Sequence, residues 1–338
     1  LPETRLRTPY VHHFGATAEA ALFDRYVATV AYVGTSGHKL IRFRTPNGGS
    51  MSPVAYGPFL DPPFDIFPLF PQELRPQPLL GGYTVIESSA GSSYNSLQAS
   101  LARRTDRGLS FQLAYTYAHA IDDVSDVFGV AGAPLQAQDE IGRDGGLRLE
   151  RASASFDVRH RFTASWVYDL PFGEGNAWLG GFQFSGIATM QTGQPFTVNS
   201  SFDANLDGNL TDRLDTLDGL TFLDDGRVRI VRDPNRPFTA FLAPFGQLGP
   251  ESTMLPRSGS IGRNTFRAAG IASVDLAVSK RFTFGSRQSL NFRIEAFNVL
   301  NRTHFGVPVR ILESPAFGSS VTTTVPARVI QFSARFSF

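Results

Sequence analysis

The chain has 338 residues, which is enough for one large β-domain or two ordinary domains. Its formal net charge of +1 gives no global attraction to nucleic acid, and the absence of cysteine excludes disulfide frameworks and thiolate metal sites. No segment approaches the roughly 18 consecutive apolar residues that a membrane-spanning helix needs, so a helical membrane protein is excluded as well.

Phenylalanine occurs 30 times, beside 32 glycines and 22 prolines. The core of a soluble protein has limited room for so many phenylalanines, whereas a β-barrel that turns an apolar face to lipid has a use for all of them. The first residues show neither an initiating methionine nor the apolar stretch of a signal peptide. We therefore expect a fragment of a longer chain rather than a processed product.

Apolar and polar residues alternate with a period of two, as in strands whose successive side chains point to opposite faces. In 108–118, Phe111 and Leu113 fall on the face opposite to Gln112. The pattern predicts about eleven antiparallel strands, each near the ~9–11 residues that cross a bilayer when tilted. In chain order they are 11–22, 25–34, 38–45, 82–89, 94–104, 108–118, 156–169, 180–192, 273–284, 288–298 and 328–338.

The connections between these segments differ in length. Short turns are expected at 105–108, 171–175 and 285–287, and long loops at 121–155, 193–269 and 301–327. Short periplasmic turns and long extracellular loops are the asymmetry of outer-membrane barrels. The proline-rich segment 46–80 is the exception, because a count of eleven strands places it on the periplasmic side. A count different by one would remove the exception.

A soluble β-sandwich also alternates in this way and is the alternative. Two features favour the membrane. The polar faces carry mid-strand charges, such as Arg293 and Asp275, as a wet lumen would. Aromatic residues such as Tyr115 and Trp166 stand near strand ends, as in the girdles at membrane interfaces. We therefore predict an all-β fold, a single antiparallel transmembrane β-barrel domain over 1–338.

Short runs spread in order over nearly the whole chain resemble one family. The chain is similar to the barrel of Oar-like TonB-dependent transporters, the relatives that carry a carboxypeptidase-regulatory-like domain at the N-terminus. The matching runs are 7–10 (RTPY), 32–37 (YVGTSG), 94–101 (YNSLQASL), 108–111 (GLSF), 115–117 (YTY), 121–123 (IDD), 157–162 (DVRHRF), 170–173 (LPFG), 185–186 (SG), 192–196 (TGQPF), 262–264 (GRN), 274–276 (VDL) and 293–301 (RIEAFNVLN).

The resemblance implies a barrel of about 22 strands around an N-terminal plug. It also implies a segment that contacts TonB, and active uptake or export of a solute across the outer membrane. The sequence lacks the plug, the TonB-contacting segment, the regulatory domain and about half of the barrel, so we expect the C-terminal half. An open sheet of eleven strands leaves two unpaired edges, which are costly in lipid, so it must close or find a partner.

Six polar residues are expected to face the lumen of the barrel. There they would hydrogen-bond to the plug or line the path of the solute; the alternative is that they solvate or brace the wall. They are Gln112, Arg161, Asp275, Arg293, Glu295 and Arg335.

The C-terminus ends in an apolar alternation that includes Phe332, Phe336 and Phe338. This pattern resembles the signal that the outer-membrane barrel-assembly machinery reads. The alternative is that a barrel simply ends on an apolar strand.

One loop has the spacing of a calcium site. Asp203, Asn205, Asp207 and Asn209, with a glycine at 208, follow the D-x-N-x-D-G pattern in which alternate residues supply oxygens to the ion. The twelfth position is Leu214 instead of a bidentate glutamate, which excludes an ordinary EF-hand. Asp212 or Asp215 could supply the missing ligand. The alternative is an Asx-rich turn without calcium.

Other candidate sites are weaker. The basic run from Arg159 to Arg161, with His160 between, is expected near the outer rim, where it would meet phosphate-bearing lipopolysaccharide or carry solvated charge. The adjacent acids Asp122 and Asp123 are interpreted as a solvated turn. The six histidines form no metal set, and no nucleophile elbow or paired catalytic carboxylate stands out, so we expect no enzyme.

Three functions follow from these patterns. The first is the C-terminal barrel portion of a TonB-dependent transporter. The second is a shortened, passive porin-like or adhesin-like barrel, and the third is a soluble all-β binding protein. Specificity for the transported solute would reside in the long loops and in the plug.

Overall fold

The computed structural model describes most of the chain. The described residues are 6–23, 25–47, 77, 79–80, 83–105, 108–125, 150–173, 176, 178–201, 212–224, 228–243, 258–284 and 287–338. Within them every long element is a β-strand, and the one helical segment is a short 3-10 turn, η5 (Phe238–Phe241).

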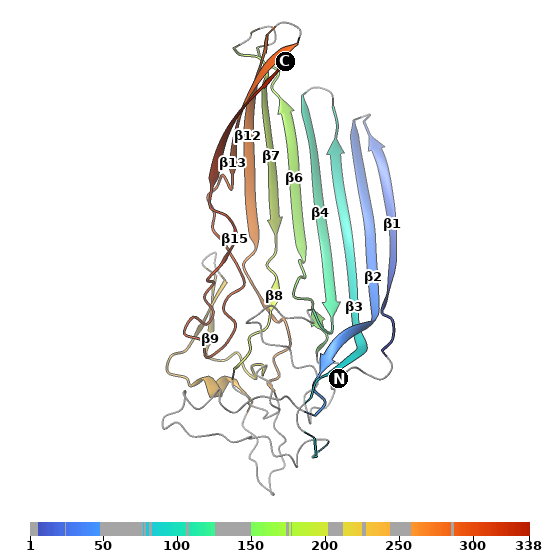
Figure 1. The fold of residues 1–338 in the computed structure, drawn as a ribbon, viewed down its shortest axis with the longest axis vertical. Helices are drawn as coiled ribbons and strands as arrows, with labels where there is room; N and C mark the ends of the chain where they lie inside the picture. Colours follow the sequence, from blue (N-terminus) through green and yellow to red (C-terminus); the bar gives the residue numbers. More distant parts are fainter. Residues whose placement is uncertain are drawn as a thin grey trace.

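A ten-stranded antiparallel sheet dominates the molecule (Figure 1). Nine of its strands follow one another in the order of the sequence, and β5 (Ala152–Ser153) pairs only with the end of β4. The nine are β1 (Tyr10–Leu22), β2 (Tyr26–Arg44), β3 (Val85–Arg103), β4 (Leu109–Asp122), β6 (His160–Asp169), β7 (Phe182–Gln191), β12 (Ile271–Phe284), β13 (Gln288–Phe297) and β16 (Val329–Ser337).

The expected count of eleven strands is wrong, because two pairs of predicted strands are each a single strand. Segments 25–34 and 38–45 together form β2, and 82–89 and 94–104 form β3. The β2–β3 register shifts on both sides of Leu40, and Lys39 next to it has a left-handed backbone (φ 55°). A β-bulge therefore absorbs the residues that resemble a turn, and the strand continues beyond it.

The two ends of the sheet carry different connections. Short turns join β1–β2, β3–β4, β6–β7 and β12–β13 at one end, which we call the turn rim; the long connections leave from the other, the loop rim (Figure 1). Because β2 ends and β3 begins at the loop rim, the segment 46–80 starts and ends there. Its expected place beside the short turns is wrong, although residues 48–76 themselves lie outside the described residues.

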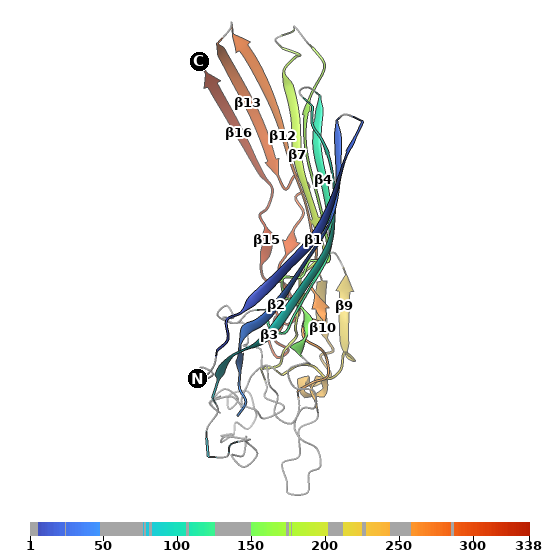
Figure 2. The ribbon, with the colours of Figure 1, turned by 90° about the vertical axis from the view of Figure 1, so that its right-hand side faces the viewer.

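Within the described residues the sheet is open. β1 pairs with β2 alone and β16 with β13 alone, so the order of pairing does not close into a ring. Seen from the side, the sheet twists and curves between β1 and β16 (Figure 2), as expected for strands with a right-handed twist. Both edge strands are exposed along their whole length.

A small folded unit lies at the loop rim. It contains the strand pairs β8 (Pro195–Phe196) with β11 (Phe266–Arg267), β9 (Leu220–Asp224) with β10 (Val228–Arg232), and β14 (His304–Phe305) with β15 (Thr323–Val325). We call it the rim cap, defined as the described residues of 193–268 and 304–325. Its core is Phe196, Val198, Leu214, Ile230, Phe241, Leu242, Phe266, Ala268 and Leu312. This core, contributed by separate connections, was not predicted.

Candidate functional site

The register divides the side chains of the sheet into two sets, because residues paired across strands point to the same face. Phe111 pairs with Trp166, Trp166 with Gly186, and Gly186 with Leu276. This row and the alternate positions along each strand form the apolar face. Its members include Tyr32, Leu97, Phe111, Leu113, Tyr115, Phe162, Trp166, Met190, Leu276, Val278, Phe292, Ile294, Phe332 and Phe336.

Large side chains on the apolar face are open to the surroundings. Leu97 is 52% exposed, Ile294 47% and Phe332 74%. In water such a surface would be costly, since burying apolar area contributes about 25 cal/mol per Å². A hydrocarbon environment removes that cost, so this face suits lipid.

All six residues predicted to face the lumen lie on the opposite, polar face, spread over β4, β6, β12, β13 and β16. Most of their cross-strand partners are small or polar as well. The partners are Ala102 and Ser165 for Gln112, Thr116 and Gln191 for Arg161, Ile187 for Asp275, Ser279 and Ser333 for Arg293, Ala277 and Gln331 for Glu295, and Asn291 for Arg335.

Three of these six residues brace the wall. Arg293 Nε donates to Glu295 Oε1 at 2.9 Å, and Asp275 Oδ1 accepts from the backbone N–H of Asn298 at 2.7 Å. Asn298 has a positive φ of 48°, so Asp275 fixes the tight turn after β13.

The other three, Gln112, Arg161 and Arg335, make no side-chain hydrogen bond with the described residues. Their polar groups therefore remain available to a ligand or to another part of the barrel.

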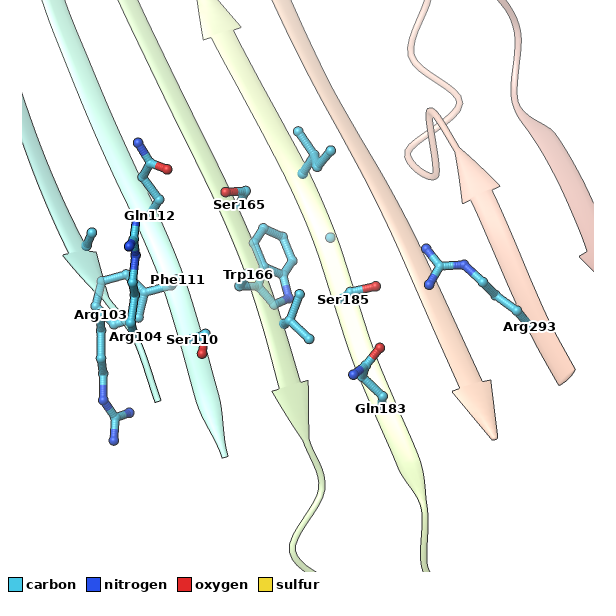
Figure 3. Close-up of a pocket in the computed structure, with 14 residues that line it drawn as sticks. Arg103, Arg104, Ser110, Phe111, Gln112, Ser165, Trp166, Gln183, Ser185 and Arg293 are labelled. Atoms are coloured by element: carbon cyan, nitrogen blue, oxygen red, sulfur yellow. The ribbon is translucent and has the colours of Figure 1, made fainter. Parts of the chain in front are cut away.

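A shallow groove of about 460 Å³ crosses the polar face towards the turn rim. Figure 3 shows Arg104 at the end of β3, Gln112 on β4, Ser185 on β7, and Arg293 pointing from β13 towards β12. Ala102, Val167 and Ile187 are the apolar side chains of this face that line it. Guanidinium, amide and hydroxyl groups at these positions can donate hydrogen bonds to an anionic or carbonyl-bearing partner.

Buried ion pairs fasten the long connections to the end of β4. Arg263 is 3% exposed and Asp122 also 3%, and their side chains form an ion pair. Arg263 Nε also donates to the carbonyl oxygen of Glu150 at 2.8 Å, while the Glu150 carboxylate pairs with Arg213 at 3.0 Å. The interpretation of Asp122 as part of a solvated turn is therefore wrong.

Asp157 makes a second set of contacts that attach the long connections to β4. Its Oδ2 lies 2.7 Å from Arg267 and 3.9 Å from Arg159, and its Oδ1 accepts from the backbone N–H of Ala120 at 2.8 Å. Asp122, Asp157 and Arg263 belong to the sequence runs at 121–123, 157–162 and 262–264 that carry the family resemblance. Their place in these runs is the sequence signal that could have identified these residues.

The predicted calcium loop comes directly before the described segment 212–224. Asp203, Asn205, Asp207 and Asn209 lie outside the described residues. Of the two substitute ligands, Asp212 is 2% exposed, and Asp215 Oδ1 accepts from the backbone N–H of Ser260 at 2.9 Å. In the described ranges no group of three or more acidic or histidine side chains is arranged to hold a metal ion. Calcium binding stays a prediction.

The C-terminal phenylalanines are exposed. Phe332 and Phe336 stand on the apolar face of the edge strand β16, and Phe338 follows its end with 94% of its surface exposed. The rings of Phe336 and Phe338 stack with their centroids 6.1 Å apart. These side chains are accessible to a partner along an unpaired strand edge.

A sheet with a lipid-suited face, a polar face and unequal rims defines the chain as part of a membrane β-barrel. Residues 2–331 match the model of the outer membrane beta barrel domain family, and the chain belongs to that family. This family places the protein in the outer membrane of the cell. Among the described residues, no helix has the length and apolar character needed to cross a bilayer. The comparison with curated proteins gives no match.

Solved structures of TonB-dependent receptor barrels resemble the chain in fold. The outer membrane transporter YddB from Escherichia coli has 10% sequence identity and a TM-score of 0.51, over 100% of this chain and 34% of YddB. The pyoverdine receptor FpvA from Pseudomonas aeruginosa has 11% identity and a TM-score of 0.46, over 98% of this chain and 30% of FpvA. The chain thus spans about a third of either protein.

Proposed function

We propose that the chain forms part of the barrel wall of an Oar-like TonB-dependent transporter, which moves a solute across the outer membrane. The polar face lines the lumen, the apolar face meets lipid, and the loop rim faces the cell exterior. Gln112, Arg161 and Arg335 contact the solute or the plug, whereas Asp275, Arg293 and Glu295 brace the wall.

The division of the sheet into two faces carries this proposal. Across the nine strands, the register places polar side chains such as Gln112, Asp275 and Arg293 on one side, and the other side is largely apolar and exposed. A soluble sandwich would cover its apolar face with a second sheet. The described residues contain no such layer over this face, so the soluble alternative is disfavoured. The similarity to YddB, which covers the whole chain, supports a transporter-type barrel.

Cysteine labelling tests the assignment of the two faces cleanly, because the chain has no cysteine of its own. In outer membranes a water-soluble maleimide should label Gln112→Cys, which would face an aqueous lumen. The neighbouring variant Leu113→Cys should stay unlabelled, because its thiol would lie in lipid. Equal labelling of both variants would refute the two-face assignment.

The orientation has a separate test. Asn235→Cys places a thiol on an exposed turn of the rim cap, and Arg287→Cys places one at the turn rim. On intact cells an impermeant maleimide should label the first and leave the second unlabelled. The reverse pattern would show that the loop rim faces the periplasm.

Transport driven by TonB requires the plug and the TonB-contacting segment. We therefore expect the polypeptide isolated from the outer membrane to exceed 36.9 kDa and to cross-link to TonB. A polypeptide of 36.9 kDa that conducts ions without TonB would support the passive porin-like alternative.

Assembly is proposed to depend on the C-terminal aromatic residues, read by the barrel-assembly machinery. Phe338→Ser should lower the amount of heat-modifiable barrel in the outer membrane. Phe172→Ser, which changes another exposed phenylalanine at the turn rim, is the matched control. Equal amounts of assembled barrel in the two variants would count against the signal.

A further inference from the structure

A second pocket lies on the apolar face, at the end next to the loop rim. It has a volume of about 600 Å³. Tyr115 on β4, His160 and Phe162 on β6, and Met190 on β7 line it, and all four belong to the apolar face by register. The rest of the lining is the chain at 191–193 and 267–272, together with Arg302, which follows β13. The pocket therefore opens where acyl chains surround the barrel and not into the lumen.

The floor of the pocket is apolar and its rim is basic. Phe162, Met190 and the short side chains before β12 offer a surface for hydrocarbon, and Met190 is 48% exposed. Tyr115 fixes the imidazole of His160, because its hydroxyl lies 2.7 Å from His160 Nδ1. The ring of Tyr117 packs against the same imidazole at 5.1 Å between centroids. His160 Nε2 makes no hydrogen bond with the described residues and is therefore available to a ligand.

The charges around the pocket do not cancel. Among the residues that the structure describes, no aspartate or glutamate lines it. Arg267 lies in the wall, but Asp157 compensates its charge at 2.7 Å. The guanidinium of Arg302 makes no ion pair with any described residue, and it therefore contributes an uncompensated positive charge at the edge of a lipid-facing surface.

We propose that this pocket binds a phosphorylated lipid of the outer leaflet, the lipid A part of lipopolysaccharide. An acyl chain lies along Phe162 and Met190, and Arg302 and His160 donate hydrogen bonds to a glucosamine phosphate. A guanidinium binds phosphate through charge-assisted hydrogen bonds. A free anion would gain nothing from the apolar floor, and a transported solute would meet the opposite face. The assignment to the outer leaflet rests on the proposed orientation of the loop rim.

This site differs from the one that the basic run suggested. Arg161 lies on the polar face, opposite to His160, because successive residues of β6 alternate. Arg159 lies 3.9 Å from Asp157, which offsets its charge. Of the three residues in the run, His160 is the one that lines the pocket.

Lipid that co-purifies with the protein tests the proposal. The full protein is extracted from outer membranes in mild detergent, and bound lipopolysaccharide is measured by native mass spectrometry. We expect Arg302→Gln to retain about tenfold less lipopolysaccharide, the loss that follows from one charged hydrogen bond. Met190→Asn should also lower retention, because it places an amide on the apolar floor.

The matched control is Arg328→Gln, which removes an exposed arginine from the same rim outside the pocket. It should retain lipopolysaccharide as the unmodified protein does. Equal retention in Arg302→Gln and Arg328→Gln would overturn the proposal.

The identity of the lipid is tested by competition on the delipidated protein. Micelles of lipid A should displace a fluorescent lipid A analogue, whereas phosphatidylglycerol and inorganic phosphate should not. Displacement by phosphatidylglycerol or phosphate at the same concentration would overturn the assignment to lipid A. None of these measurements uses TonB or transport. If the transport proposal fails, the lipid measurements can therefore still be interpreted. If the lipid proposal fails, the transport proposal is unaffected.

Discussion

The sheet and the rim cap use the same apolar residue types in opposite ways. On the sheet, Ile294 and Phe332 point outward and are 47% and 74% exposed. In the rim cap, Ile230 and Phe241 are 1% and 0% exposed and pack into a closed core. Apolar side chains gain by leaving water, and they can do so by entering lipid or by packing on one another. The contrast therefore marks which part of the chain lies in the membrane and which part stands in water.

The largest expected effect concerns the ion pair that joins the two regions. Arg263→Met leaves the Asp122 carboxylate buried without its partner, so we expect a loss of about 3–5 kcal/mol in the stability of the rim cap. Hydrogen exchange of the rim-cap amides measures this loss, while the amides of the sheet should stay protected. The double variant Asp122→Leu/Arg263→Met should recover much of it. A double variant as unstable as Arg263→Met would argue against the pair as the cause.

The next effect tests which face meets lipid. Leu113→Arg places a charge on the apolar face of β4. It should destabilise the folded barrel in bilayers by about 2–4 kcal/mol. Gln98→Arg, on the polar face of the adjacent strand, should change it far less. Denaturant titration in lipid vesicles gives both values. Similar losses in the two variants would remove the distinction between the faces.

A smaller effect sharpens the comparison with one matched substitution. Ile230→Val deletes a methylene group from the closed core and should cost about 0.5–1.5 kcal/mol. Ile294→Val deletes the same group from the exposed apolar face and should change stability by less than about 0.5 kcal/mol. Equal costs in an unfolding titration would mean that Ile294 is buried against protein in the native barrel.

The smallest effect is a dependence on pH in the rim cap. Burial, and next the charge of Arg302, lower the pKa of His304 below its usual value of 6.5. The unfolded chain therefore takes up the proton more readily than the folded one. The stability that neutral His304 contributes to the rim cap is complete above pH 6.5, and it is lost as the pH falls through the pKa of His304 in the folded protein. Exchange of the β14–β15 amides between pH 7.5 and 5.5 should show this loss, and His304→Gln should flatten it.

The sequence predicted most of the sheet because alternation is a local signal. Seven of the nine long strands in the pairing order correspond one to one with predicted segments. The remaining two, β2 and β3, were each predicted as two separate strands, because residues such as Gly37 and Gly91 resemble turn positions. At Gly37 an added Cβ would lie 2.5 Å from Ser92 Oγ, so the glycine serves the close approach of β2 and β3.

The rim cap and the ion pairs that attach it to the sheet could not be predicted in this way. Its core joins residues as far apart as Phe196 and Leu312, and Asp122 lies 141 residues from Arg263. No periodicity links such positions, because their contacts depend on how three long connections fold over one another. For the polar face, alternation identified the residues, but it could not separate the bracing pair Arg293–Glu295 from the unengaged Gln112.

The shared core of the rim cap has a consequence for how the loop rim of this barrel can change. Leu214 and Phe241 come from the connection between β7 and β12, Leu312 comes from the connection between β13 and β16, and Glu150 precedes β6 and binds Arg213. Exchanging one of these loops for that of a relative would remove part of a core on which the others rest. New binding specificities should therefore arise by substitutions on the outside of an intact unit, and grafts should succeed only when the three connections are transferred together.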